Sequence, residues 1–159
     1  MKRFNELLDD ARVLKIENST NPIIGSLVYD SRSVEPGSCF FAVRGTQSDG
    51  HTYIASAIER GAVAVICESM PEERVDGVSY AVVEDSNIAM AAMAAAFYNH
   101  PSRELKLVGV TGTNGKTTTA TLLYDMFMAM GHNAGLISTV VYRIGSRSIH
   151  STHTTPDSI

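Results

Sequence analysis

The sequence GVTGTNGKTTT, residues 109–119, follows directly after an apolar run at 105–108 and is the most informative stretch of the chain. This order predicts a short buried strand, a glycine-rich turn and a helix that begins at Lys116. Such a turn can bind phosphate, because its backbone N–H groups converge on an anion and the helix N-terminus adds the positive end of its dipole. We therefore predict a phosphate-binding loop.

The residues that close this turn agree with nucleotide chemistry. Lys116 can reach the β- and γ-phosphates of a nucleotide, and the Thr117 hydroxyl can reach Mg²⁺. The spacing departs from G-x-x-x-x-G-K-[ST] at one position, where Val110 stands in place of the first glycine. The alternative is an ordinary turn rich in glycine and asparagine. The G-K-T ending and the strand–turn–helix order together favour the phosphate loop.

Composition places the chain among packed globular proteins. It has 159 residues, of which 44% are hydrophobic, and its formal net charge is −4 at pH 7. A negative charge without any block of Lys or Arg argues against a nucleic-acid partner. No apolar segment is long enough to span a membrane and residues 1–10 lack a signal-peptide core, so we expect a cytoplasmic protein without membrane insertion. Cys39 and Cys67 each lie in a predicted strand and are expected to be buried, reduced thiols.

Two domains are predicted, at 1–103 and 104–159, because the polar stretch NHPSRE at 99–104 interrupts the pattern. Ser86 is predicted to be the N-cap of an Ala- and Met-rich helix. The expected strands and helices of the first domain alternate, which indicates a small mixed α/β domain. The expected strands lie at 24–29, 39–43, 63–67 and 80–83, and the expected helices at 4–11, 51–60 and 86–98.

The second domain is predicted to be the first part of a parallel-sheet P-loop domain, with strands at 105–110 and 135–144 on either side of the Lys116 helix. One helix face is predicted to pack in the core and consists of Leu122, Leu123, Met126, Phe127 and Met130. A nucleotide-binding sheet is normally covered on both faces, and these elements are too few for that. We therefore expect a fragment of a longer polypeptide, whose second domain is weakly stable because its sheet has exposed edges.

Three further motifs, taken with the phosphate loop, resemble the Mur ligase family. YDSRSVEPG at 29–37, with CFFAVRG at 39–45 and DGH at 49–51, is similar to the uridine-nucleotide-binding domain of that family. TNGKTT at 113–118 resembles its ATP signature, including the absence of a glycine at Val110. TTPD at 154–157 is similar to the T-T-P element of the branch that extends UDP-MurNAc-L-Ala-D-Glu, which separates it from the branch that adds D-alanyl-D-alanine.

The resemblance implies an ATP- and Mg²⁺-dependent amide ligase of peptidoglycan precursor synthesis, with small-molecule substrates. A carboxylate of UDP-MurNAc-L-Ala-D-Glu would attack the γ-phosphate of ATP. The amine of a diamino acid, meso-diaminopimelate or L-lysine, would then displace the acyl phosphate. Lys116 and Thr117 would be the catalytic residues, and Thr117 would also hold Mg²⁺. The residues that would bind ATP are Gly112, Thr113, Asn114, Gly115, Lys116, Thr117 and Thr118.

The resemblance also implies a site for the UDP-MurNAc-dipeptide. Ser31 and the backbone at Tyr29 would contact the uridine diphosphate, as would the loop formed by Thr46, Gln47 and Ser48. Thr154 and Thr155 would hold the muramoyl-peptide portion near the phosphate loop. The carbamylated lysine, the other Mg²⁺ ligands and the C-terminal domain of the family have no counterpart in these 159 residues, so the isolated polypeptide is expected to be inactive.

Two other interpretations remain open from the sequence. The first is a non-catalytic module that binds a uridine nucleotide through residues 1–100 and does not turn over ATP. The second is a small P-loop kinase, which is disfavoured because a long α/β segment precedes the phosphate loop and no acceptor-binding lid follows it. Asp30 and Arg32, on either side of Ser31, can be a structural charge pair even where Ser31 contacts a nucleotide.

Overall fold

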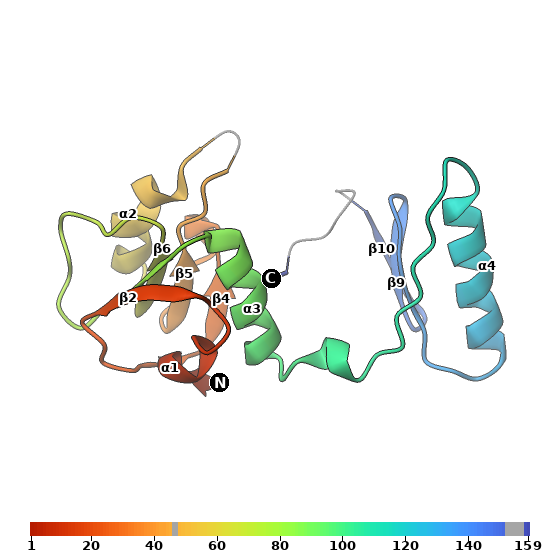
Figure 1. Ribbon diagram of the computed structural model, residues 1–159, viewed down its shortest axis with the longest axis horizontal. Coiled ribbons are helices and arrows are strands. Elements are labelled where there is room, and N and C mark those ends of the chain that lie inside the picture. Colours follow the sequence, from red (N-terminus) through yellow and green to blue (C-terminus); the bar gives the residue numbers. More distant parts are fainter. Residues whose placement is uncertain (46–47, 152–157) are drawn as a thin grey trace. The chain divides into compact units, whose positions relative to one another are not determined.

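The computed structural model describes residues 1–45, 48–151 and 158–159, and these form two compact units (Figure 1). The first unit comprises Met1–Leu105 together with Ser158–Ile159, and the second is Lys106–Asp157. Within the described ranges, no helix is both long enough and apolar enough to cross a lipid bilayer. Some predicted site residues lie outside the described residues: Thr46, Gln47, Thr154 and Thr155.

A five-stranded mixed sheet forms the centre of the first unit, with the strand order β2-β7-β6-β5-β4. The strands β4, β5, β6 and β7 run parallel to one another, and β2 is antiparallel to β7 at one edge. The bounds are β2 (Val13–Glu17), β4 (Ser26–Val28), β5 (Ser38–Phe41), β6 (Ala64–Cys67) and β7 (Ser79–Val83). This arrangement confirms the mixed α/β class.

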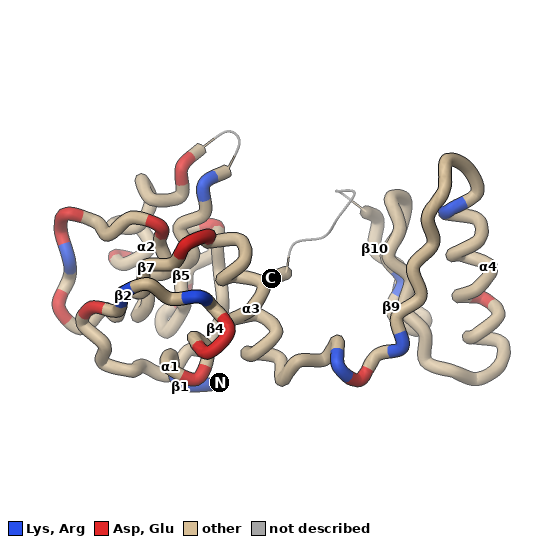
Figure 2. Tube along the Cα trace, viewed as in Figure 1, with Lys and Arg blue, Asp and Glu red and all other residues tan. Residues whose placement is uncertain are grey.

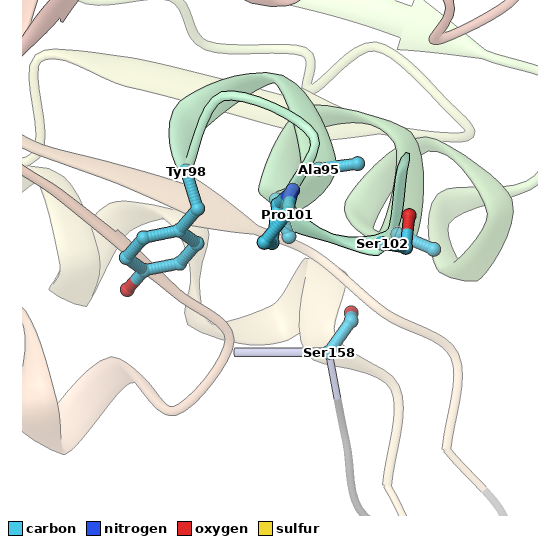
Figure 3. A pocket seen from close by; sticks show the side chains of 7 residues that line it. Ala95, Tyr98, Pro101, Ser102 and Ser158 are labelled. Atoms are coloured by element: carbon cyan, nitrogen blue, oxygen red, sulfur yellow. The ribbon is translucent and has the colours of Figure 1, made fainter. Parts of the chain in front are cut away.

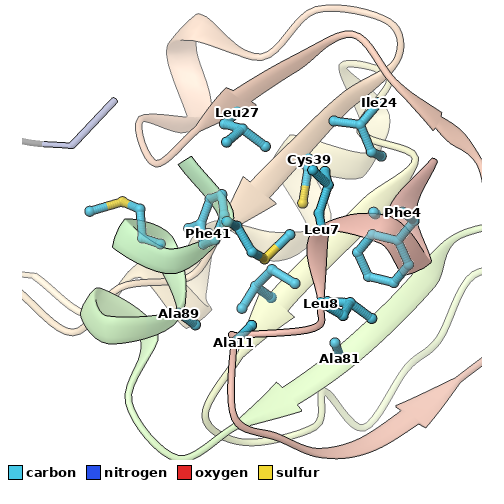
Figure 4. Close-up of a cluster of buried hydrophobic side chains, with 14 of the residues drawn as sticks. Phe4, Leu7, Leu8, Ala11, Ile24, Leu27, Cys39, Phe41, Ala81 and Ala89 are labelled. Carbon is cyan, nitrogen blue, oxygen red and sulfur yellow. The ribbon is translucent and has the colours of Figure 1, made fainter. Parts of the chain in front are cut away.

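Both faces of this sheet are covered by helices, which is why β5 and β6 are buried throughout. The helices α1 (Phe4–Leu7) and α3 (Ser86–Phe97) contribute to the cluster that contains Cys39 and Phe41 (Figure 4). The helix α2 (Ile54–Glu59) contributes to a second cluster around Phe40. Neighbouring residues of β5 therefore face opposite cores, as the two-residue period of a strand requires. Cys39 and Cys67 are buried free thiols, as predicted.

The strand predicted at 24–29 is divided in two at Gly25. Its first part, β3 (Ile23–Ile24), pairs with β1 (Lys2–Arg3) in a separate antiparallel sheet, and the second part is β4. The Gly25 N–H donates instead to the Gly37 carbonyl at 2.9 Å. The strand β2 was not predicted from the sequence, because Leu14 and Ile16 are exposed in it and its burial does not alternate.

The helix α3 begins at the predicted residue and ends one residue early, whereas α2 begins three residues later than predicted. The helix α1 is shorter than predicted, although Leu8 and Ala11 beyond its end are still buried. The unit also contains short 3₁₀ helices of three or four residues, namely η1 (Ser31–Ser33), η2 (Gly50–Tyr53) and η3 (Pro101–Arg103). The N-cap of α3 is Asp85 rather than Ser86, because the Asp85 carboxylate accepts from the backbone N–H groups of Asn87 at 2.8 Å and Ile88 at 3.0 Å.

The second unit combines one long helix with a three-stranded antiparallel sheet. The helix α4 (Lys116–Ala129) begins at the predicted residue. The strand predicted at 135–144 consists of two strands, β8 (Gly135–Ile137) and β9 (Val141–Ile144), and β10 (Arg147–His150) completes the order β10-β9-β8. No parallel strand pair is present among the described residues of this unit, so the parallel sheet predicted here is not formed by them.

Two packing predictions for the second unit are wrong. Residues 105–110 form no strand, and Leu107 in their middle is 92% exposed. Of the predicted apolar face of α4, Leu122, Met126 and Met130 are exposed, and the buried residue of this helix is Tyr124. The physical reason is the same in both cases. A strand needs a hydrogen-bonded neighbour and an apolar helix face needs a covering layer, and the described residues supply neither.

Candidate functional site

The motif residues of the first unit follow the carboxyl ends of its parallel strands. Residues 29–33 follow β4, residues 42–49 follow β5, Glu68 follows β6, and Asp85 lies two residues after β7. Because the four strands are parallel, these segments meet at one edge of the sheet. Open α/β sheets bind their ligands outside this edge. The predicted uridine-nucleotide residues that the structure describes, Tyr29, Ser31 and Ser48, are all at this edge.

The turn after β4 is shaped by a pair of charged residues. Asp30 caps η1 by accepting from the Arg32 backbone N–H at 2.9 Å, and its carboxylate also binds the Arg32 guanidinium through Nη2 at 2.8 Å and Nε at 3.0 Å. These hydrogen bonds from Arg32 lower the pKa of Asp30 to about 2. The Ser31 side chain between them is half-buried, and its hydroxyl hydrogen-bonds to none of the described residues. The turn therefore fixes the backbone and leaves Ser31 available to a ligand.

A small hollow of about 280 Å³ lies beside this turn. Its apolar part is formed by Leu27 and Val28, and its polar rim by Asp30 and Ser33. Tyr29 and Ile159 complete the lining. Whole small-molecule sites are usually somewhat larger, about 300–1,000 Å³. This hollow therefore suits one part of a nucleotide, such as its ring, rather than the complete ligand.

A second hollow of about 240 Å³ lies against α3 and η3 (Figure 3). It is lined mainly by small apolar residues of α3 and by the Tyr98 ring. Ser102 and Ser158 provide hydroxyl groups at its edge, and no charged residue lines it. None of the motif residues described above contributes to it, and no sequence pattern pointed to it.

After β5, residues 43–45 pair with residues 48–50 as the two sides of a hairpin, which we call the 43–50 hairpin. Arg44 and Asp49 pair across it as an antiparallel bridge, and the Gly45 N–H donates to the Ser48 carbonyl at 3.0 Å. The Gly50 N–H donates to the Val43 carbonyl at 2.9 Å and closes the hairpin. Ser48 is exposed near the tip, whereas Thr46 and Gln47 lie outside the described residues. Of the predicted contact residues of this segment, Ser48 therefore faces solvent at the carboxyl edge of the sheet.

A polar network holds the base of this hairpin, and we call it the His51–Glu68 network. It comprises Arg44, Asp49, His51, Glu68 and Ser86. Asp49 Oδ1 accepts from the His51 backbone N–H at 2.9 Å and lies 2.6 Å from the His51 ring Nδ1. The hydrogen bonds from the backbone and the ring of His51 lower the pKa of Asp49. Glu68 Oε1 accepts from the Ser86 N–H at 3.1 Å and hydroxyl at 2.8 Å. This network was not predicted from the sequence, although the motif DGH at 49–51 was a signal for part of it.

The predicted phosphate loop, residues 112–118 of the second unit, has backbone N–H groups that are free to donate. Gly112 has φ of 149° and Gly115 has φ of 78°, values at which other residues are strained. Within the part of the chain that the structure describes, no backbone N–H of residues 112–118 donates a hydrogen bond. The first acidic residue of α4 is Asp125, so no carboxylate of this helix neutralises its N-terminus (Figure 2). This geometry fits an anion.

The Lys116 ammonium is folded back on the loop in this conformation. Its Nζ donates to the Gly112 carbonyl at 2.5 Å and lies 3.4 Å from the Thr113 carbonyl. A phosphate group that binds the free N–H groups would compete for this ammonium with a stronger, charge-assisted hydrogen bond. Thr117 is half-buried beside it, and its hydroxyl is a suitable oxygen ligand for Mg²⁺. The described residues include no cluster of His, Cys, Asp or Glu that would hold a metal.

The fold agrees with comparisons to known proteins. The family description "Mur ligase family, catalytic domain" matches residues 23–113, and "Mur ligase middle domain" matches residues 110–159. The chain therefore belongs to the Mur ligase family, which confirms the resemblance predicted from its motifs. Among solved structures, it is similar to a UDP-N-acetylmuramoyl-L-alanyl-D-glutamate–2,6-diaminopimelate ligase, with a TM-score of 0.62 and 27% identity over 85% of this chain and 27% of that one.

Other relatives give the same placement. The UDP-N-acetylmuramoyl-L-alanyl-D-glutamate–2,6-diaminopimelate ligases of Bacteroides thetaiotaomicron and Parabacteroides distasonis are 49% and 52% identical over 98% and 97% of the chain. The chain spans 32% of the length of each of these relatives. The MurF ligase of Thermotoga maritima, solved in complex with ADP, has a TM-score of 0.51 and 33% identity over 65% of this chain and 23% of that one.

Proposed function

We propose that the chain provides the uridine-nucleotide site and the phosphate loop of an ATP-dependent ligase that joins 2,6-diaminopimelate to UDP-MurNAc-L-Ala-D-Glu. The observation that supports this proposal most strongly is the sequence identity of 49% and 52% to two UDP-N-acetylmuramoyl-L-alanyl-D-glutamate–2,6-diaminopimelate ligases over nearly the whole chain. This similarity extends across both units and includes the phosphate loop. The sequence alone left meso-diaminopimelate and L-lysine open, and the names of these relatives favour diaminopimelate.

The first unit would hold the uridine diphosphate at the carboxyl edge of its sheet. The backbone at Tyr29 is assigned to this contact because Tyr29 lines the hollow beside β4. Ser31 is assigned to it because it lies in the same turn, between the lining residues Asp30 and Ser33, and its hydroxyl hydrogen-bonds to none of the described residues. Ser48, with Thr46 and Gln47, is assigned to the same ligand because the hairpin after β5 reaches this edge. Thr154 and Thr155 are assigned to the muramoyl-peptide portion by their resemblance to the T-T-P element.

The second unit would bind the phosphates of ATP through the free N–H groups of residues 112–118. Transfer of the γ-phosphoryl group to a substrate carboxylate brings two anions together, so it depends on positioning and charge neutralisation. Lys116 would leave the Gly112 carbonyl and place its ammonium on the transferred group. Thr117 would ligate Mg²⁺, which supplies further neutralisation when it is bound. The amine of the diamino acid would then form the C–N bond as the phosphate leaves.

Calorimetric titration of the chain with UDP, and separately with Mg·ATP, tests this proposal with two matched variants. We expect Ser31→Ala to weaken UDP binding and to leave Mg·ATP binding unchanged, and Lys116→Ala to do the reverse. UDP binding without any Mg·ATP binding would support the non-catalytic module instead. That alternative is favoured by one observation, namely that residues 105–110 before the phosphate loop form no strand. Binding of neither ligand would refute both functions.

A further inference from the structure

We propose that His51 is a positioning residue for the uridine nucleotide. Its neutral ring connects the 43–50 hairpin to the carboxyl end of β6. This connection determines where the hairpin meets the ligand. The inference rests on the proposed function of this edge. His51 itself is not assigned a contact with the nucleotide. Its action would pass through the backbone of the hairpin that carries Ser48.

The partners of the His51 ring determine which nitrogen carries the proton. Nε2 lies 2.9 Å from the Glu68 backbone nitrogen and 3.3 Å from that of Ser69, and both are N–H donors. Nε2 must therefore be an acceptor without a proton. Nδ1 then carries the proton and donates it to Asp49 Oδ1 at 2.6 Å. This assignment makes the ring neutral and joins the hairpin, through Asp49, to the backbone that follows β6.

The opposite side of the hairpin is held by the side chains of the same two residues, Glu68 and Ser69. Arg44 Nε lies 3.4 Å from Glu68 Oε2 and 3.7 Å from Asp49 Oδ2, and Arg44 Nη2 donates to the Ser69 hydroxyl at 3.2 Å. The charged groups around His51 are thus Asp49, Arg44 and Glu68. Because Arg44 and Asp49 also pair directly with each other, both sides of the hairpin are fixed to the end of β6. Loss of the ring would release the Asp49 side.

The fold of the unit depends on other contacts, so positioning and stability can be separated. After His51 the chain buries Ile54 and Ala57 in the second core cluster, and these contacts do not involve the ring. Glu68 is half-buried and Ser69 is exposed, so water can reach their N–H groups when the ring is removed. We therefore expect a substitution at His51 to weaken nucleotide binding more than it lowers stability.

Two conservative variants distinguish the roles of the two ring nitrogens. In His51→Gln the amide oxygen can occupy the position of Nε2 and accept from the Glu68 N–H, whereas the shorter His51→Asn can replace Nδ1 alone. We expect His51→Asn to weaken the affinity for UDP by about tenfold or more, which is the scale of one lost positioning interaction. We expect His51→Gln to retain most of the affinity of the unmodified chain for UDP. The control His132→Asn, in the second unit, should bind UDP as the unmodified chain does.

Thermal unfolding and nitrogen NMR of the ring are measured on the same proteins. Support requires midpoints of unfolding close to that of the unmodified chain, and a ring with its proton on Nδ1 at neutral pH. Unchanged UDP affinity in His51→Asn, equal losses in the Gln and Asn variants, or a proton on Nε2 would each overturn the positioning role. If the unmodified chain binds no UDP, the proposed function fails and this inference fails with it. If it binds UDP and His51→Asn binds equally well, the inference alone fails.

Discussion

Substitution of Gly50 by alanine should disrupt the hairpin that carries the predicted nucleotide contacts. A Cβ atom at position 50 would lie 2.6 Å from both the nitrogen and the oxygen of Val43, and 3.0 Å from the carbonyl carbon of Ala42. All three are backbone atoms, so no flexible side chain can move aside. Overpacking of this kind costs about 1–3 kcal/mol, and loss of the hydrogen bond from Gly50 to Val43 adds about 1 kcal/mol.

The expected loss of about 2–4 kcal/mol is large enough to measure by calorimetry and far-UV circular dichroism. In a domain of this size each kcal/mol lowers the Tm by about 4–8 °C, so we expect a decrease of roughly 10–25 °C. Gly25→Ala is the matched control in the same unit, because a Cβ there would meet only the Gly37 carbonyl oxygen at 3.7 Å, an ordinary contact. Equal midpoints for the Gly50→Ala and Gly25→Ala variants would refute the steric argument.

Three further outcomes are expected. Asp85→Ala should lower the free energy of unfolding by about 1 kcal/mol because α3 loses its N-cap, whereas Asp85→Asn should retain most of it, as measured by urea unfolding. The Asp30 carboxylate should titrate near its lowered pKa of about 2, and Arg32→Gln should move the midpoint toward the ordinary value of 3.8, as followed by carbon NMR. The 159-residue polypeptide should form no UDP-MurNAc-tripeptide from its substrates and Mg·ATP, as measured by chromatography.

For each of these three predictions, a specific result would contradict the reasoning. Equal destabilisation by Asp85→Ala and Asp85→Asn would show that capping is not the source of the effect. The lowered pKa of Asp30 means that its ion pair adds stability above the ordinary pKa and loses it as the pH falls through about 2. Because this pair is exposed, the contribution is small. A midpoint that is unchanged by Arg32→Gln would contradict the assigned cause, and tripeptide formation would contradict the expected inactivity.

Local signals allowed much of the fold to be predicted. The start of α4 at Lys116 was predicted correctly because Gly115 before it takes a positive φ that few other residues tolerate. The strands β5, β6 and β7 were predicted within one or two residues, because their apolar runs are buried on both faces of a parallel sheet. These features depend on residues that are close together in the sequence.

Features that depend on distant partners were not predictable in this way. The run at 105–110 has the composition of a buried strand, but no described strand pairs with it, and Leu107 is exposed. The His51 ring meets the Glu68 backbone across 17 positions of the sequence, and no local pattern shows that contact. Asp85 and Ser86 are both good N-cap residues, so the sequence alone does not decide between them. Because the Ser86 hydroxyl donates to Glu68, the N-cap of α3 is Asp85.

A proton–nitrogen NMR titration of the chain with UDP tests the central claim most directly, since it reports on each backbone amide separately. We predict that shifts concentrate in residues 29–33, 48–51 and 68–69, at the carboxyl ends of β4, β5 and β6. The amides of 112–118 should change only when Mg·ATP is added. Shifts confined to the second unit, or no response to UDP at any concentration that the protein tolerates, would contradict the assignment of this edge as the uridine-nucleotide site.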